Sequence, residues 1–230
     1  MFVKSFIGII ASFKHLLSIE MDVRFHSPYS MILSGASGCG KTTWVTRFLE
    51  NLSECCTERP KKIIWCYGIF QPLFIELTKR FPDIEFIEGL PENVCEQFDM
   101  EGPSLLIIDD MLEKCSEDSK ISQIFTRTSH HRNISVMLLV QNIFYKGLRT
   151  ISLNAHYICL FKQVRDRSQS YCLARQMFPT SVKFFTEAYL DATKLPYSYL
   201  LVDCRPQTLE DFRLRTRIFP NENTIVYVKK

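Results

Sequence analysis

The sequence has no cysteine pair with C-x-x-C spacing, and no cysteine pair with zinc-ligand spacing from a histidine. Its nine cysteines are an odd number, they are scattered along the chain, and several fall within apolar runs. They are Cys39, Cys55, Cys56, Cys66, Cys95, Cys115, Cys159, Cys172 and Cys204. The pattern argues against a zinc module or a disulfide framework, and it predicts free thiols in a reducing compartment.

A membrane-spanning run is also missing near the N-terminus. The apolar residues 6–13 lie between Lys4 and Lys14, and this run is too short to cross a bilayer. It has no convincing small-residue cleavage site, which a signal peptide would carry. We therefore expect residues 1–20 to form a short helix or an arm, packed on the domain or on a neighbouring subunit.

No repeat, low-complexity segment or flexible linker divides the rest of the chain. A length of 230 residues fits one domain with a large buried core, and we expect it over residues 21–230. Hydrophobic residues at 46% and charged residues at 23% are ordinary values for a globular protein. The net charge of +3 is too small to identify a partner by itself.

The strongest local signal is the pattern G-x-x-x-x-G-K-T at residues 35–42. An apolar run precedes it at residues 29–33, and apolar residues at helical spacing follow it at 44–49. Strand, tight loop and helix are the context of a phosphate-binding loop, or Walker A motif. A glycine-rich turn that matches by chance is the alternative.

Each residue type in this loop has a chemical reason. Gly35, Gly38 and Gly40 allow backbone angles that a side chain would forbid, and they bring N–H groups against phosphate oxygens. The helix that starts near Lys41 directs its positive end at the same phosphates. Lys41 would reach the β- and γ-phosphates, and the Thr42 hydroxyl would bind Mg²⁺. The predicted nucleotide-binding residues are Gly35, Ala36, Ser37, Gly38, Cys39, Gly40, Lys41, Thr42 and Thr43.

A second signal lies at residues 104–110, where four apolar residues precede two acids. The apolar residues fit a central strand buried on both faces, the Walker B strand. Asp109, at its carboxyl end, would hold Mg²⁺ through water. Asp110 would activate the attacking water as a general base, or it caps the next turn. Paired acids downstream of a phosphate loop favour hydrolysis of a nucleoside triphosphate over simple binding.

Another apolar run, at residues 133–140, predicts a buried strand that ends at Gln141. A side-chain amide at the tip of the strand beside the metal-binding one can contact the γ-phosphate or orient water. Capping of the strand's backbone is an equally good explanation of Gln141 from the spacing alone.

The remaining pattern alternates strands with helices. Further strands are predicted at residues 21–25, 62–67, 84–88, 157–161 and 199–202, and helices at 72–81, 92–98, 120–131, 168–177 and 180–192. Residues 212–228 alternate like a β-ribbon. This order predicts an α/β fold with a mostly parallel central sheet, helices on both faces and a C-terminal β-ribbon.

Positive charge is concentrated between residues 120 and 167, where Asp166 is the only acid. The basic residues are Lys120, Arg127, Arg132, Lys146, Arg149, Lys162, Arg165 and Arg167. Basic loops beyond a nucleotide site fit contact with a polyanion, and Lys162, Arg165 and Arg167 are the candidate DNA contacts. The alternative is a solvated face with one or two arginines that reach the phosphates of a neighbouring subunit.

Taken together, these residues resemble the viral genome-packaging ATPases of the FtsK–HerA superfamily, in the poxvirus-type branch found in large DNA viruses, adintoviruses and Polinton (Maverick) elements. The matching segments are FHSP at 25–28, GASGCGKTT at 35–43, LLIIDDM at 105–111, HHRNISVMLLVQN at 130–142, LRTISLNAHYICLFK at 148–162 with the RDR after it, and RLRTRIF at 213–219. The resemblance covers nearly all of the chain from about residue 21, and residues 129–167 make it specific.

The resemblance implies a P-loop NTPase of RecA/FtsK-like fold that uses ATP and Mg²⁺ to move double-stranded DNA into a preformed capsid. It implies a homo-oligomeric ring, a pentamer or a hexamer, that works with capsid proteins in the nucleus or a cytoplasmic assembly site of a host cell, or within the virion. Genome cutting would need other proteins.

The resemblance also assigns roles to residues. It gives phosphate binding to Lys41, magnesium binding to Thr42 and Asp109, the catalytic carboxylate to Asp110 and a sensor amide to Gln141. The superfamily usually has Glu where this chain has the shorter Asp110, although Asp occurs in the viral branch. Rings of this kind complete each site with an arginine from the neighbour; the candidates are Arg127 and Arg132, with Arg149 behind them.

Other functions remain open at this stage. A small-molecule kinase of the same fold would need an acceptor site and an arginine-bearing lid, which Arg165 and Arg167 could imitate. The paired acids and Gln141 argue against it, because a kinase needs no water-activating base. A slowly hydrolysing nucleotide switch would not respond to DNA, and a helicase would differ only in separating strands.

Overall fold

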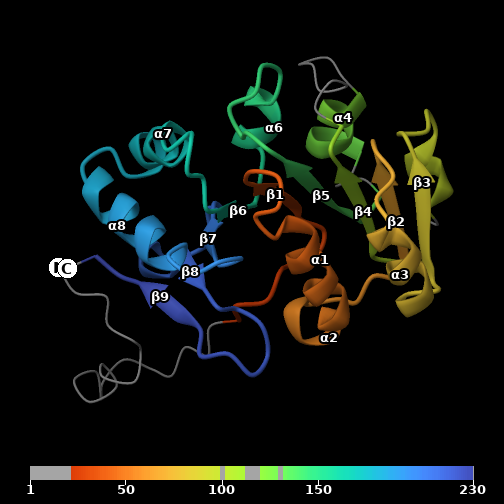
Figure 1. The fold of residues 1–230 in the computed structure, drawn as a ribbon, viewed down its shortest axis with the longest axis horizontal. Helices are drawn as coiled ribbons and strands as arrows, with labels where there is room; N and C mark the ends of the chain where they lie inside the picture. The colour runs from red at the N-terminus through yellow and green to blue at the C-terminus, as the bar shows by residue number, and fades with distance from the viewer. Residues whose placement is uncertain (1–21, 99–101, 112–119, 129–131, 230) are drawn as a thin grey trace.

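The computed structural model describes residues 22–98, 102–111, 120–128 and 132–229. All strands in this part of the chain belong to one sheet of order β3-β2-β4-β5-β1-β6-β7-β8-β9 (Figure 1). They are β1 (Ser30–Ser34), β2 (Lys62–Tyr67), β3 (Ile84–Glu88), β4 (Ser104–Asp109), β5 (Ile134–Val140), β6 (Tyr157–Phe161), β7 (Tyr199–Asp203), β8 (Leu214–Thr216) and β9 (Ile225–Tyr227).

In this spatial order, the six strands β3, β2, β4, β5, β1 and β6 pair in parallel. The last three, β7, β8 and β9, pair in antiparallel fashion. The predicted α/β class, the mostly parallel sheet and the C-terminal ribbon of β8 and β9 are therefore confirmed.

The central strands are mostly apolar because both faces of the sheet are covered. Successive side chains of β1 alternate between two cores: Met31 and Leu33 lie in one, and Ile32 lies in the other. Every residue of β1, β4 and β5 is buried, as expected for parallel strands between helical layers.

The helices form a layer on each face (Figure 1). One core contains residues from α1 (Lys41–Glu50), α2 (Leu52–Cys55) and α3 (Leu73–Arg80), and the other contains residues from α4 (Lys120–Gln123), α6 (Arg149–Leu153), α7 (Ser168–Met177) and α8 (Val182–Ala192). The helix predicted at residues 92–98 is a 3₁₀ turn, η2 (Val94–Gln97). The helix predicted at residues 120–131 begins as α4, which is followed by a π-helical turn, η4 (Ile124–Thr128). A second 3₁₀ turn, η5 (Glu210–Phe212), precedes β8.

The strand predicted at residues 21–25 is wrong for the residues that the structure describes, 22–25. Phe25 makes only an isolated bridge, to Cys56. Asp22 accepts hydrogen bonds from the backbone N–H and the guanidinium of Arg24, a local arrangement that competes with strand pairing. Phe25 itself is buried against the rings of Tyr29 and Tyr157, at centroid distances of 5.6 and 4.8 Å. Its burial, and not a sheet, explains why residue 25 is apolar.

The arm predicted at residues 1–20 lies outside the described residues. Among those that are described, no helix is long and apolar enough to cross a membrane. The described cysteines are free, as predicted, and Cys172 on α7 is exposed; Cys115 lies outside this part.

A buried ion cluster holds the antiparallel extension to the body of the sheet. Asp203 of β7 is 0% exposed and accepts hydrogen bonds from Arg205 Nη2 at 2.8 Å and from Arg215 Nη2, on β8, at 3.0 Å. The Arg205 guanidinium lies 4.9 Å from the ring centroid of Tyr157 on β6. The cluster therefore links three neighbouring strands through one carboxylate.

Replacing this carboxylate by an amide should destabilise the protein strongly. Asp203→Asn leaves the buried Arg215 cation without its counter-charge, and breaking a buried pair in this way costs about 3–5 kcal/mol. Asp22→Asn removes an acid that also pairs with an arginine, Arg24, but at the surface, so it should cost less than about 1 kcal/mol. Urea denaturation of both variants measures the difference, and equal midpoints would contradict a structural role for the buried cluster.

Candidate functional site

The carboxyl ends of the parallel strands bring the predicted site residues together. The register pairs Ser34 at the end of β1 with Val140, and Asp109 at the end of β4 with Leu139. The phosphate loop, the two acids and Gln141 consequently line one cavity of about 420 Å³. The predicted residues on its wall are Ser37, Gly38, Gly40, Lys41, Thr42, Thr43, Asp109, Asp110 and Gln141.

The glycines of the loop are needed for two different reasons. Gly38 and Gly40 have φ angles of 74° and 105°, which side chains rarely adopt. Gly35 has no such angle; a Cβ there would lie 2.5 Å from Cys39 Sγ and 2.7 Å from Phe161 Cβ. The expectation about backbone angles therefore holds for Gly38 and Gly40, whereas Gly35 is required by close packing.

Lys41 begins α1, and its ammonium folds back over the loop. Its Nζ donates to the carbonyl oxygens of Gly35 at 2.6 Å and Ala36 at 3.2 Å. A positive charge therefore lies at the loop beside the N-terminus of a ten-residue helix, where an anion is favoured. Burial raises the pKa of the neighbouring Cys39 thiol, which keeps it protonated and disfavours its reaction.

Asp109 is a buried acid without a compensating partner. It is 5% exposed, and neither its Oδ2 nor the nearby Trp65 Nε1 has a hydrogen-bond partner among the described residues. Burial raises the pKa of Asp109 to about 6, against the opposing effect of Lys41 and with a further increase from Asp110. Such a carboxylate favours a cation beside it.

The residues at this point fit Mg²⁺. Thr42 and Asp109 line the same cavity, so a hydroxyl and a carboxylate are available as oxygen ligands. The described part of the chain has no cluster of three or more histidine, cysteine or acidic residues that could hold a metal. A single carboxylate with a hydroxyl suits Mg²⁺, which keeps several waters and shares phosphate oxygens with its substrate.

Asp110 and Gln141 lie at the open side of the cavity. Asp110 has a φ of 53°, so the chain turns sharply after β4, and its side chain is exposed. Gln141 Nε2 lies 3.5 Å from Asp110 Oδ1, at the limit of a hydrogen bond. The backbone of Asp110 also passes close to Gly68, where an added Cβ would lie 2.5 Å from the Asp110 carbonyl oxygen. The carboxylate and the amide are thus held as a pair.

The loop that follows β6 is tied to the cavity wall. Gln163 Nε2 donates to the backbone oxygen of Gln141 at 2.7 Å, and Asn142 Nδ2 donates to Asp166 Oδ2 at 3.3 Å. Hydrogen bonds from Ser168 and Gln169 also lower the pKa of Asp166. The charge of Asp166 is therefore satisfied by neutral donors and not by the arginines that flank it.

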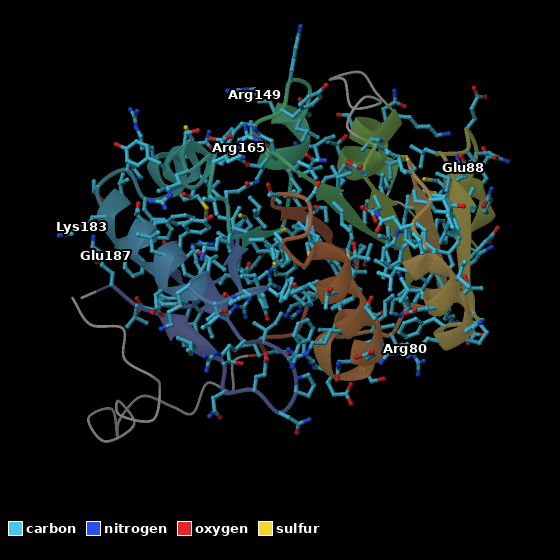
Figure 2. The ribbon with its side chains drawn as sticks, viewed as in Figure 1. Arg80, Glu88, Arg149, Arg165, Lys183 and Glu187 are labelled. Carbon is cyan, nitrogen blue, oxygen red and sulfur yellow. The ribbon has the colours of Figure 1, made fainter. Side chains whose placement is uncertain are left out.

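The basic residues of residues 120–167 separate into two groups. Lys120 and Arg132 donate to the backbone oxygens of Pro91 and Cys95, at 2.6 and 2.9 Å. Five others are exposed, and in the described part of the chain they form no ion pair: Lys146, Arg149, Lys162, Arg165 and Arg167. Figure 2 shows Arg149 and Arg165 on the same upper side of the molecule.

The three candidate arginines for a neighbour's site are placed differently. Arg149 is exposed at the start of α6 and projects outward (Figure 2). Arg132 lies just before the amino end of β5, away from the carboxyl ends that carry the cavity, and its guanidinium donates to the backbone oxygen of Cys95. Arg127 belongs to the π-helical turn, and its side chain lies outside the described part of the structure.

The sequence did not indicate three other residues on the cavity wall, Gln71, Leu139 and Tyr197. Leu139 belongs to a predicted strand, and Gln71 precedes a predicted helix. Tyr197 stands in the connection between α8 and β7, in no motif, and only the fold brings it to the phosphate loop.

No protein-family model matches the sequence, and no curated protein matches it either. Solved structures do resemble the chain. The genome packaging NTPase B204 of Sulfolobus turreted icosahedral virus 2, in complex with ATP-gammaS, gives a TM-score of 0.56 at 14% identity, over 79% of this chain and 95% of that one. Its complex with AMP gives 0.53 at 15% identity, over 82% and 96%.

A bacterial structure is also similar. The cytoplasmic domain of the Type VII secretion ATPase EccC from Thermomonospora curvata gives a TM-score of 0.52 at 13% identity, over 86% of this chain and 25% of that one. The chain has the fold of P-loop, FtsK-like ATPases. At these identities the likeness concerns the fold.

The buried Asp109 should reduce the stability of the protein as the pH rises. Because its pKa is raised from 3.8 to about 6, the folded chain binds more protons than the unfolded chain between these values. The free energy of unfolding should therefore fall between about pH 4 and 6, by at most about 3 kcal/mol. Asp109→Asn should remove this loss and be the more stable protein at pH 7, without nucleotide or magnesium.

Urea denaturation from pH 4 to 8 checks this expectation. Asp110→Asn is the matched control, because it removes the neighbouring, exposed charge and should keep most of the pH dependence. A wild-type slope that persists in Asp109→Asn would show that another group is responsible.

Proposed function

We propose that the protein is an ATP-driven motor that moves double-stranded DNA into a preformed viral capsid, a member of the poxvirus-type branch of the FtsK–HerA packaging ATPases. The catalytic domain is residues 21–230, and residues 1–20 form its arm. The fold shared with the packaging NTPase B204 supports this proposal, as does the composition of the cavity at the phosphate loop.

ATP is the substrate that suits this cavity. Backbone N–H groups of the loop bind the phosphates, and Lys41 turns its ammonium from the loop carbonyls to the β- and γ-phosphates. Mg²⁺, held by Thr42 and Asp109, would neutralise charge that develops on the phosphates. Asp110 accepts the proton of the attacking water. Gln141, whose Nε2 lies 3.5 Å from Asp110 Oδ1, orients that water.

The observation that carries the motor function is the connection between the nucleotide cavity and the basic loop. Gln163 donates to the backbone oxygen of Gln141, and Asp166 accepts a hydrogen bond from Asn142, so two hydrogen bonds join the loop after β6 to the segment that carries Gln141. Lys162, Arg165 and Arg167 are exposed on this same loop. A change at the cleaved phosphate can therefore be transmitted to side chains that hold a DNA backbone.

A ring of identical subunits completes the proposal. A pentamer or hexamer would place an arginine of one subunit beside the phosphates of the next, where it stabilises the charge of the transition state. Of Arg132 and Arg149, the two candidates whose side chains the structure describes, Arg149 is the better placed, since it is exposed and projects away from its own subunit (Figure 2). Capsid proteins at the assembly site, in the nucleus or the cytoplasm of a host cell, are the other expected partners.

The decisive experiment measures ATP hydrolysis with and without long duplex DNA, together with the particle mass in the same samples. Hydrolysis should be stimulated by DNA in the samples that contain rings. Asp110→Asn should bind ATP as well as the wild type while hydrolysing it about 10²–10⁴ times more slowly, the usual loss for a general base. Hydrolysis by a monomer that ignores DNA would support a nucleotide switch, and phosphorylation of a metabolite would support a kinase.

DNA binding should depend on the basic loop. Removing two phosphate contacts in Arg165→Ala/Arg167→Ala should weaken duplex binding and reduce the slope of log K against log salt by about 0.9 for each contact. Arg80→Ala/Lys183→Ala removes the same charge at sites far from Arg165 (Figure 2) and should leave the slope unchanged. A titration of labelled duplex at several salt concentrations gives both slopes, and identical slopes would assign the loop arginines another role.

A further inference from the structure

Tyr197 separates two cavities and lines both of them. The first is the phosphate cavity described above. The second, of about 410 Å³, lies between α1, the connection from α8 to β7, and the C-terminal ribbon. Its walls include Arg47, Asp191, Tyr199 and Glu222. Because the two cavities share Tyr197, one elongated ligand could occupy both.

The structure holds Tyr197 in place at this boundary. Its φ of 60° is in the left-handed region, which a bulky residue adopts only when its surroundings require it. A Cβ added to Gly40 would lie 3.0 Å from Tyr197 Cδ1, so the ring packs directly on the phosphate loop. Tyr197 is nevertheless 67% exposed. An exposed aromatic ring fixed against a phosphate loop is a surface on which a flat group can stack.

Charged side chains of both signs line the second cavity; four of them are paired with one another, whereas Arg217 forms no ion pair in the described part of the chain. Arg47 Nη1 donates to Glu222 Oε1 at 2.7 Å, and Lys194 Nζ donates to Asp191 Oδ1 at 2.9 Å, so these charges are paired within the protein. Glu222 Oε2 is buried and has no hydrogen-bond partner among the described residues. A ligand's hydroxyl or amine donor reaches this oxygen once the Glu222 side chain turns into the cavity.

We propose that this second cavity binds the nucleoside part of the nucleotide, with the base stacked on the ring of Tyr197 and its donors directed to Glu222. The inference rests on the proposed function, because it requires that the triphosphate lie on the loop beside Lys41. It assigns to Tyr197 and the ribbon the recognition of the base, while the phosphate loop binds any triphosphate.

The test compares the binding of ATP with that of inorganic tripolyphosphate, by calorimetry, in the wild type and three variants. Tyr197→Ala removes the ring. Tyr197→Asn also removes it but accepts the left-handed backbone well, and Tyr197→Phe keeps the ring without the hydroxyl. Ala and Asn should weaken ATP binding about 5- to 150-fold, the range for base–aromatic stacking, and leave tripolyphosphate within about twofold. Phe should resemble the wild type for both ligands, and thermal melting confirms that each variant folds.

Other results overturn the inference in distinguishable ways. Equal losses for ATP and tripolyphosphate would mean that Tyr197 acts through Gly40 on the phosphate loop. Unchanged ATP binding in Ala and Asn would mean that the base lies elsewhere. If the wild type binds tripolyphosphate but the variants bind ATP normally, the base site at Tyr197 is refuted and the proposed function stands. If the wild type binds neither ATP nor tripolyphosphate, the base site and the proposed function are both refuted.

Discussion

The parallel register of β4, β5 and β1 is the constraint on which the candidate site depends. The last residue of β1 pairs with the last residue of β5, and the last residue of β4 pairs with the residue before it. Every group that would act on a phosphate lies at or after one of those strand ends. β5 stands between the loop strand and the acid strand, so Gln141 emerges between Lys41 and the two acids. The geometry of the site is thus a property of the sheet, and the loops only complete it.

A cost in stability accompanies this geometry. Asp109 ends a strand that is buried on both faces, and its Oδ2 has no hydrogen-bond partner among the described residues to replace the water it has lost. The protein retains a charge that opposes its own folding and that a bound cation would offset. Another buried acid, Asp203, differs in that it is paired with two arginines.

Much of this could be predicted from the sequence, because periodicity and motif spacing report local structure. The phosphate loop, the acid strand and the position of Gln141 follow from residues adjacent in the chain. The strand predicted at residues 21–25 is wrong over the described residues 22–25, because alternating apolar and polar residues fit both a strand and a loop that inserts one ring, that of Phe25, into a core. Tyr197 and Glu222 could not be found, since the proximity of residue 197 to Gly40 depends on how β7 returns antiparallel beside β6.

The exposure of Cys172 offers a practical consequence. Among the described cysteines it alone is exposed, and burial raises the pKa of the thiols at Cys39, Cys55, Cys56, Cys66, Cys95, Cys159 and Cys204. A maleimide dye should therefore attach at α7 in preference to these other positions. Since α7 directly follows the loop that carries Lys162, Arg165 and Arg167, such a dye would report on the surroundings of that loop.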